Sequence, residues 1–313
     1  MSTGRNAPKK KGKKKLVFSL IAILLIGIFI YGYYILDKAE NVEISEDDED
    51  LGIDEEIVER NKDYDVINVI LFGIDRRGTS GNARSDSMII ASLDRTNKVV
   101  KLTSLMRDTY IEIPGRGMDK LGHAYAYGGP ELAVKTINHN FDLDIKEFMT
   151  VDFTGFEQII EAVGGVEVDI TSAEANHMKL PSSGLQVLDG QRALEYSRIR
   201  KIGNDYERTE RQRTVLEAVF KKMTTMSVTS YPNMLNKLLP LVETSLRKSE
   251  MVSLGTDIIR ADIKNMEQFR LPVDGYVADD YIDGVSYVVP LSLEDNVNLL
   301  RDFIYNENNI VSN

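Results

Sequence analysis

The chain lacks two residue types altogether, because its 313 residues include no cysteine and no tryptophan. Without cysteine there are no disulfide bonds, so a folded domain must be held together by its core alone. Zinc is also disfavoured, because no thiolate exists and the three histidines, His123, His139 and His177, are scattered. No Walker loop, G-x-S-x-G elbow or dinucleotide fingerprint is present, which argues against the enzyme classes that depend on them.

Acidic residues are missing from the first 36 positions, whereas the rest of the chain is strongly acidic. Of the 38 basic residues, seven lie before residue 16. That leaves 31 basic against 49 acidic residues from residue 37 onward, a net charge of −18. An arginine cluster inside so acidic a domain therefore needs a local structural or functional explanation.

An uncharged run of 21 residues occupies positions 16–36 (LVFSLIAILLIGIFIYGYYIL). At about 1.5 Å per residue, a helix of this length spans a bilayer core of roughly 30 Å. Because lysines precede the run and acids follow it, we expect residues 1–15 to form a cytoplasmic tail and residues 37–313 to lie outside. The alternative is a cleaved signal peptide, which the length of the run and the lack of a small-x-small cleavage site disfavour.

Residues 37–63 are rich in acids and poor in apolar residues, which predicts a solvated linker. Residues 64–313 are long enough for one domain with a large core. Strand patterns occur at 66–73, 87–94, 98–105, 148–153, 165–170, 269–273 and 285–290. Helices are predicted at 129–141, 154–163, 190–195, 206–226, 231–247 and 293–305. This mixed order favours an α/β fold, a three-layer α/β/α sandwich around a mixed central sheet.

Four charged residues are expected at one rim of this sheet. If strands 66–73 and 87–94 pair antiparallel and strand 98–105 returns in a hairpin, then Asp75, Arg84, Asp86 and Arg107 come together there. Two carboxylates and two guanidinium groups suit a hard cation such as Mg²⁺ together with a phosphate. The alternative is a surface ion-pair network.

The segment YSRIRKIGNDYERTERQR (196–213) contains five arginines in eighteen positions. If its start is extended, Arg198 and Arg200 point the same way. In the helix that follows, Arg208, Arg211 and Gln212 continue the face that carries Val215 and Val219. Arginine grips phosphate with a planar fork, and a bound anion would offset the cost of cations near a helix N-terminus. The alternative is pairing with Glu207, Glu210 and Glu217. It explains Arg211 and Arg213 adequately, but it explains Arg198, Arg200 and Arg208 poorly.

One further candidate is His123 in the segment DKLGHAYAYGG. It could act as a base or be a hydrogen-bonded structural residue, and the sequence leaves both readings open.

Several ordered blocks resemble the LytR–CpsA–Psr proteins of Gram-positive cell envelopes. They are NVILFGIDRR, RSDSMIIASLD, KLTSLMRDTYIEIPG, KLGHAYAYGGPELAVKTIN, VDFTGFEQIIEAVGGVEVDI, LDGQRALEYSRIR and DYERTERQR, and they cover most of residues 65–225. The resemblance implies transfer of an anionic glycopolymer, such as teichoic acid or capsule, from undecaprenyl pyrophosphate to peptidoglycan N-acetylmuramic acid. It also implies a membrane-anchored extracellular domain, a Mg²⁺ cofactor and no nucleic-acid partner.

The resemblance also assigns roles to residues. It implies that Asp75 and Asp86 hold Mg²⁺. The residues that it places around the pyrophosphate are Arg84, Arg107, Arg198, Arg200, Arg208 and Gln212. Arg107, Arg198, Arg200 and Asp205 would be catalytic. Two alternatives remain open on the sequence, namely a regulator that only binds polyprenyl phosphates and a hydrolase that cleaves the pyrophosphate.

Overall fold

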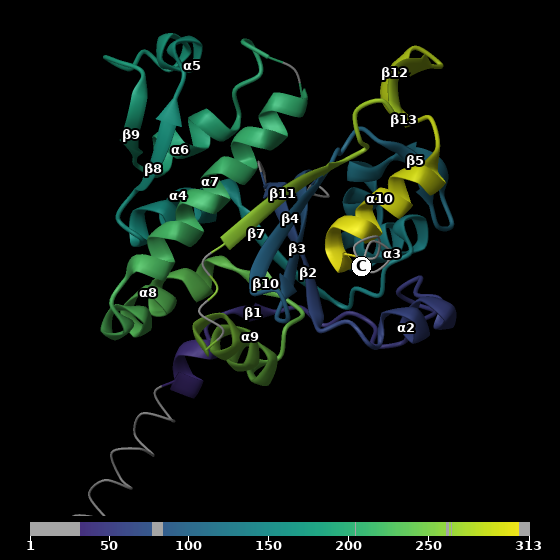
Figure 1. Ribbon diagram of the computed structural model, residues 1–313, viewed down its shortest axis with the longest axis horizontal. Coiled ribbons are helices and arrows are strands. Elements are labelled where there is room, and N and C mark those ends of the chain that lie inside the picture. Colours follow the sequence, from purple (N-terminus) through teal and green to yellow (C-terminus); the bar gives the residue numbers. More distant parts are fainter. Residues whose placement is uncertain (1–31, 77–83, 204, 261–262, 264, 307–313) are drawn as a thin grey trace, which may run out of the picture.

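The protein is seen in a computed structural model that describes residues 32–76, 84–203, 205–260, 263 and 265–306. A seven-stranded mixed sheet lies at its centre, with strand order β1-β10-β7-β2-β3-β4-β11 (Figure 1). The strands are β1 (Glu40–Asn41), β2 (Val66–Asp75), β3 (Arg84–Asp94), β4 (Val99–Leu105), β7 (Glu147–Asp152), β10 (Glu243–Thr244) and β11 (Asn265–Leu271). Strands β2, β3 and β4 form the antiparallel meander that the apolar runs predict, and β7 and β11 flank it in parallel.

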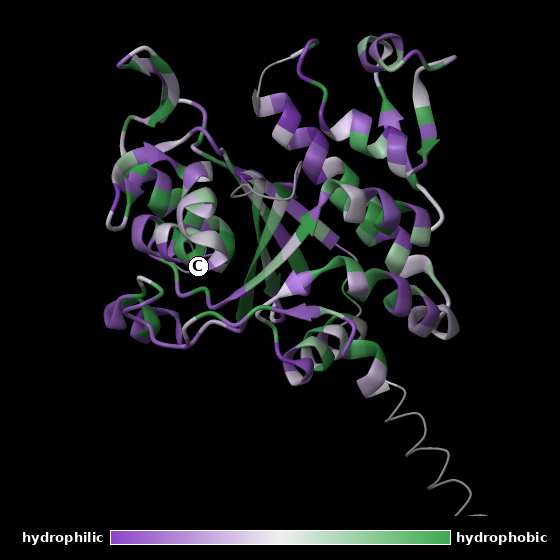
Figure 2. Cartoon of the chain, turned by 180° about the vertical axis from the view of Figure 1, so that it is seen from behind, coloured by the Kyte–Doolittle hydropathy of each residue, from purple (hydrophilic) through white to green (hydrophobic). Residues whose placement is uncertain are grey.

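Helices pack on both faces of the sheet. On one face, α3 (Leu121–Phe141) and α10 (Leu293–Tyr305) cover buried strand residues such as Ile70 and Ile90. On the other face, α7 (Asp205–Thr225) is tied to the strands by hydrogen bonds. Figure 2 shows the strands as the hydrophobic centre of the molecule. The predicted α/β class with a mixed central sheet is therefore confirmed.

A second, smaller core lies beside the sheet on the α7 side. It is built from α4 (Phe153–Ala162), α6 (Gly190–Ser197), α8 (Tyr231–Leu238), α7 and the hairpin of β8 (Val166–Ile170) with β9 (Gly184–Leu188). Val215 of α7 is completely buried in it, as the helical spacing predicts. This core fixes the position of α7 relative to the sheet.

The remaining elements are short. Two further hairpins pair β5 (Tyr110–Ile113) with β6 (Gly117–Lys120) and β12 (Val277–Ile282) with β13 (Val285–Pro290). The other helices are α2 (Glu55–Asn61), α5 (Ser172–His177), α9 (Lys248–Arg260) and the 3₁₀ turns η1 (Val228–Ser230) and η2 (Leu239–Leu241). In α3, Gly128 and Gly129 have non-helical dihedral angles, so the predicted start of a helix there is a kink within a longer one.

The structure contradicts the solvated linker predicted for residues 37–63. Strand β1 pairs with β10, and α2 packs on the domain. Leu51 is fully buried in the main core together with Ile53. The few apolar side chains of this segment are therefore core residues, and its acids occupy the solvent-facing positions between them.

The helix predicted over 231–247 is also wrong beyond Leu238. Pro240 follows in a 3₁₀ turn, and Glu243–Thr244 then joins the sheet as β10. The predicted transmembrane helix, residues 16–36, falls almost entirely outside the described residues. Within the described part of the chain, no helix is both long enough and apolar enough to cross a membrane.

Candidate active site

The predicted rim exists, and a β-bulge shapes it. Asp75, the last residue of β2, lies opposite Arg84, the first residue of β3. The pairing runs from Ile74↔Ser85 to Gly73↔Ser87, so Asp86 is the extra residue of the bulge. A bulge re-aims a side chain next to a site, and here it sets the carboxylate of Asp86 beside Arg107.

Arg107 follows the end of β4 and lies against the start of α3. Its carbonyl oxygen accepts a hydrogen bond from the Gly122 amide at 2.8 Å. Its guanidinium forms an ion pair with Asp86 through Nη1 and donates from Nε to Asp108 at 3.2 Å. Burial alone would lower the pKa of Arg107, but the two carboxylates outweigh it and raise that pKa, so the guanidinium stays charged.

Arg198 and Arg200 flank a buried residue after α6. Ile199 between them is 2% exposed and anchors the segment in the second core, whereas both arginines are exposed. The guanidinium carbon of Arg198 lies 4.5 Å from the centre of the Phe153 ring, a cation–π contact that orients it. The extended start predicted for this segment is wrong, because Tyr196 and Ser197 belong to α6 and Arg198 is its C-cap. Both arginines nevertheless line one pocket, which the turn after α6 and the burial of Ile199 bring about.

Helix α7 supplies the next two predicted residues. Arg208, in its first turn, is 4% exposed. One turn later, Gln212 accepts a hydrogen bond from Ser87 Oγ at 3.0 Å, which leaves its NH₂ group as a donor. By contrast, Arg211 is buried against Glu174 at 2.6 Å and Glu207 at 3.2 Å, and is therefore structural.

These residues enclose a pocket of about 430 Å³, which we name the arginine pocket. Its lining residues are Asp86, Ser87, Arg107, Phe153, Ser197, Arg198, Arg200, Arg208 and Gln212. Four guanidinium groups thus face one carboxylate, an excess of positive charge in an otherwise acidic domain. Such a pocket attracts a dianion and offers it forked donors. The sequence did not predict Ser87, Phe153 and Ser197 as lining residues, because nothing in their residue types or spacing points to phosphate binding.

A second pocket, of about 360 Å³, adjoins the first. It is lined by Arg84, Ser85, Asp86, Arg107, Asp108, Lys120, Gly122, His123 and Val285. Asp86 and Arg107 line both pockets, so the two cavities meet at this ion pair. The structure therefore places Arg84 in the second pocket, apart from the arginines of α7. Asp75 lines neither pocket, and the side chain of Asp205, the first residue of α7, lies outside the described residues.

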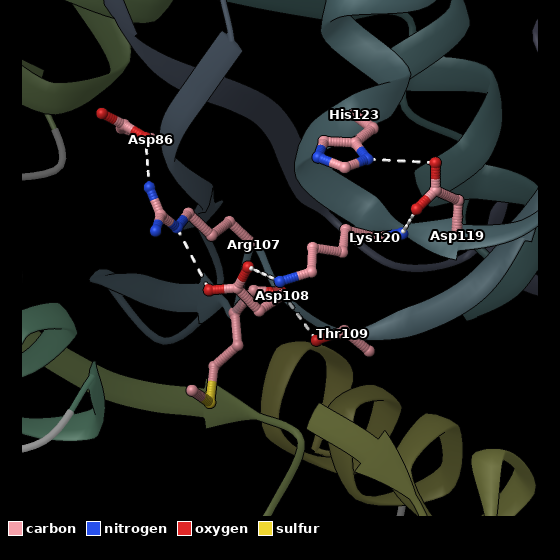
Figure 3. A network of polar contacts seen from close by, with 8 residues as sticks. Asp86, Arg107, Asp108, Thr109, Asp119, Lys120 and His123 are labelled. Atoms are coloured by element: carbon pink, nitrogen blue, oxygen red, sulfur yellow. Dashed lines mark hydrogen bonds and ion pairs between the residues drawn. The ribbon is translucent and has the colours of Figure 1, made fainter. Parts of the chain in front are cut away.

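A polar network surrounds the second pocket (Figure 3). Lys120 Nζ donates to Asp108 at 2.8 Å, and His123 Nδ1 lies 3.0 Å from Asp119 Oδ2. The Tyr127 hydroxyl donates to the same carboxylate at 2.7 Å. Burial would raise the pKa of Asp119, but the hydrogen bonds from Tyr127 and His123 outweigh it and lower that pKa. Asp119 therefore remains an anion over the whole neutral range.

Two carboxylates are the candidate metal ligands. Within the described residues, no group of three or more His, Asp or Glu side chains could hold a metal alone. Asp75 and Asp86 supply hard oxygen donors at one rim, next to a pocket built for an anion. This fits Mg²⁺, which usually binds through one or two carboxylates and completes its shell with water and substrate phosphates.

Two partly buried apolar side chains lie on the same face of the sheet as Ser87 of the arginine pocket. Leu71 and Met149 lie side by side on the sheet face that carries Ser87, the face hydrogen-bonded to α7. Both are only partly buried, whereas Ile70 and Phe72 on the opposite face are 0% and 2% exposed. Apolar strand side chains on this face of the sheet are therefore incompletely covered.

Comparison with known proteins gives a consistent result. Residues 30–300 match the LytR_cpsA_psr family. The "Polyisoprenyl-teichoic acid--peptidoglycan teichoic acid transferase TagU" of Bacillus cereus (strain AH820) is 33% identical over 304 residues, covering 93% of this chain and 98% of that protein. The solved structure "TagT bound to LIIa-WTA" is 30% identical with a TM-score of 0.64, over 77% of this chain and 91% of that one. TagT "with bound octaprenyl pyrophosphate lipid" is 28% identical with a TM-score of 0.60, over 77% and 90%.

Proposed function

The chain belongs to the LytR–CpsA–Psr family, and from this premise and the arginine pocket we propose what it transfers. It is a transferase that takes an anionic glycopolymer, of the teichoic acid or capsular type, from undecaprenyl pyrophosphate. The acceptor is the N-acetylmuramic acid of peptidoglycan, and the product is a phosphodiester. The reaction takes place outside the cell, on a domain held at the membrane by residues 16–36.

The observation that carries the proposal is the arginine pocket itself. A pyrophosphate diester brings two negative charges, and the four guanidinium groups of Arg107, Arg198, Arg200 and Arg208 neutralise them with forked hydrogen bonds. Arg208 lies in the first turn of α7, where a cation is unfavourable unless an anion is bound. The partly covered apolar surface at Leu71 and Met149 offers a path for the lipid chain beside the phosphates.

The chemistry requires positioning and charge neutralisation more than a covalent intermediate. Arg107 and Arg200 bind the phosphate oxygens and stabilise the charge that develops on the leaving lipid phosphate. Gln212 donates to the same anion through its NH₂ group. Asp75 and Asp86 would hold Mg²⁺, which supplies further neutralisation of the phosphates when bound. The pyrophosphate linkage is already activated, so no external energy source is needed.

The test uses the full chain in detergent micelles with a radiolabelled lipid-linked teichoic acid donor. With peptidoglycan present, we expect polymer-bound label and an equal amount of lipid monophosphate. Lipid monophosphate released without an acceptor, and unchanged when the acceptor is added, would identify a hydrolase. Donor binding with no release in either case would identify a binding regulator, and either result would refute the transferase.

A further inference from the structure

The second pocket has a charge pattern unlike that of the arginine pocket. Two carboxylates, Asp86 and Asp108, line it together with three cations, whereas four guanidinium groups face one carboxylate in the arginine pocket. Two of the three cations are engaged in ion pairs within the pocket, because Asp108 pairs with Lys120 and Arg107 and Asp86 pairs with Arg107. Such a mixed set of donors and acceptors attracts a dianion less than the arginine pocket does, and it matches the hydroxyl groups of a neutral sugar. Because this pocket meets the arginine pocket at Arg107, a sugar hydroxyl here lies next to a phosphate bound there.

A nucleophilic hydroxyl must lose its proton to some group in this pocket. Both described carboxylates that line it are engaged in ion pairs, which makes them poor proton acceptors. His123 differs, because Asp119 holds only its Nδ1 and thereby favours the tautomer whose Nε2 carries a lone pair. Figure 3 shows this second nitrogen on the side of the ring away from Asp119, toward Asp86 and Arg107.

The backbone fixes His123 in relation to the phosphate site. The amides of Leu121 and Gly122, just before it, donate to the carbonyl oxygens of Thr109 at 2.9 Å and Arg107 at 2.8 Å. The start of α3 is thus bonded to the segment that carries Arg107. The ring of Tyr127 packs against the imidazole at 5.9 Å between centroids, and its hydroxyl holds the carboxylate of Asp119 from the other side. Such an arrangement preorganises a base.

We propose that the second pocket binds the acceptor sugar and that His123, positioned by Asp119, accepts the proton of its hydroxyl group; this rests on the transfer proposed above. In the step, the hydroxyl oxygen forms a bond to the phosphorus that carries the glycopolymer. The bond from that phosphorus to the bridging oxygen breaks, and its electron pair leaves with the lipid monophosphate. The proton moves to His123 Nε2 and is then released to solvent.

The test measures single-turnover transfer by the full chain in detergent, with saturating lipid-linked donor and peptidoglycan. His123→Asn keeps a donor for Asp119 but has no base, and we expect transfer to fall about 10²–10⁴-fold while donor affinity is unchanged. The matched control is His139→Asn, an exposed histidine at the other end of α3, which should transfer like the wild type. Asp119→Asn should lower the rate by a smaller factor, because it removes orientation only.

The pH profile separates a base from a structural residue. In the wild type the rate should rise as the imidazole loses its proton, and in His123→Asn this rise should disappear. The charged and titratable groups that contact the imidazole or line its pocket are Arg84, Asp86, Arg107, Asp108, Asp119, Lys120 and Tyr127, and Arg116 lies over the Tyr127 ring. Transfer by His123→Asn within about threefold of His139→Asn, or an equal loss of donor binding, would overturn the role of His123. No transfer by the wild type would instead overturn the proposed function.

Discussion

Arg107 Nη1 and Asp86 Oδ1 form an ion pair at the boundary between the two pockets. One partner is the extra residue of a β-bulge, and the other lies just beyond the neighbouring strand. In the proposed reaction, Arg107 would bind the phosphate and Asp86 the cation, and each neutralises the other until substrate arrives. The proposed donor and acceptor pockets meet at this pair.

The guanidinium group of Arg107 should be essential for transfer. Arg107 contacts Asp86 and Asp108 at once and also faces the arginine pocket, which a lysine with its single ammonium cannot do. We expect Arg107→Lys to lower single-turnover transfer by about 10²–10³-fold, with far-ultraviolet circular dichroism unchanged. The control is Arg192→Lys, an exposed position on α6 outside both pockets. A variant as active as this control would show that Arg107 is only an ion-pair partner.

Close packing at Gly122 should couple the start of α3 to the active site. A Cβ atom there would lie 3.1 Å from Arg107 Cβ and 3.1 Å from the Ser85 carbonyl oxygen. Gly122→Ala should therefore cost about 1–3 kcal/mol of unfolding free energy and reduce transfer by displacing Arg107. Gly255→Ala, at an exposed site of α9 with no atom within 4 Å, should instead stabilise by about 0.5–1 kcal/mol. Chemical denaturation measures both, and a neutral Gly122→Ala would contradict the coupling.

The buried ion pair of Glu174 and Arg211 should make the free energy of unfolding depend on pH in the acidic range. Burial would raise the pKa of Glu174, but the hydrogen bonds from Arg211 and Thr171 lower it below its ordinary value of 4.5. The stabilisation is therefore fully present above pH 4.5 and is lost as the pH falls through the lower pKa of the folded state. Glu174→Gln should cost about 3–5 kcal/mol at neutral pH and become nearly neutral in acid. A cost independent of pH in denaturation curves would exclude this origin.

Magnesium should be needed for turnover. Asp86 lines both pockets and is the carboxylate nearest to the arginines. We expect EDTA to abolish transfer, added Mg²⁺ to restore it, and Asp86→Asn to shift the Mg²⁺ requirement to higher concentration, because one ligand charge is lost. Asp169→Asn, on an exposed position of β8, serves as the control. Equal rates in EDTA and Mg²⁺ would mean that the arginines alone neutralise the phosphates.

The sequence predicts the parts of the fold that depend on local pattern. Strands β2, β3 and β4 contain the strand patterns predicted at 66–73, 87–94 and 98–105, and α10 lies at Leu293–Tyr305, where its spacing places it. The linker predicted for residues 37–63 was wrong because composition averaged over a window hides single core residues such as Leu51. Strand β10 was not predicted because a strand of two residues has no periodicity. Its pairing with β7 is a tertiary contact.

The site was predictable to the same extent. Arg208 and Gln212 come together because helical spacing holds locally, whereas Arg198 and Arg200 reach the same pocket through the turn after α6 and not through the extended segment that was predicted. Arg84 lies in the second pocket because a bulge at Asp86 shifts the strand register. No pattern in the sequence predicts this bulge. His123 and Asp119 are four residues apart in the sequence. Whether they pair depends on where α3 begins, which the sequence left open.

The most direct measurement is the position of a bound pyrophosphate, determined by crystallography of the chain with farnesyl pyrophosphate and Mg²⁺. We expect both phosphorus atoms in the arginine pocket, within hydrogen-bonding reach of Arg107, Arg200 and Arg208. We also expect the lipid chain along the sheet face of Leu71 and a metal ion at Asp86. A pyrophosphate bound elsewhere, with the arginine pocket free of phosphate, would contradict the proposed donor site.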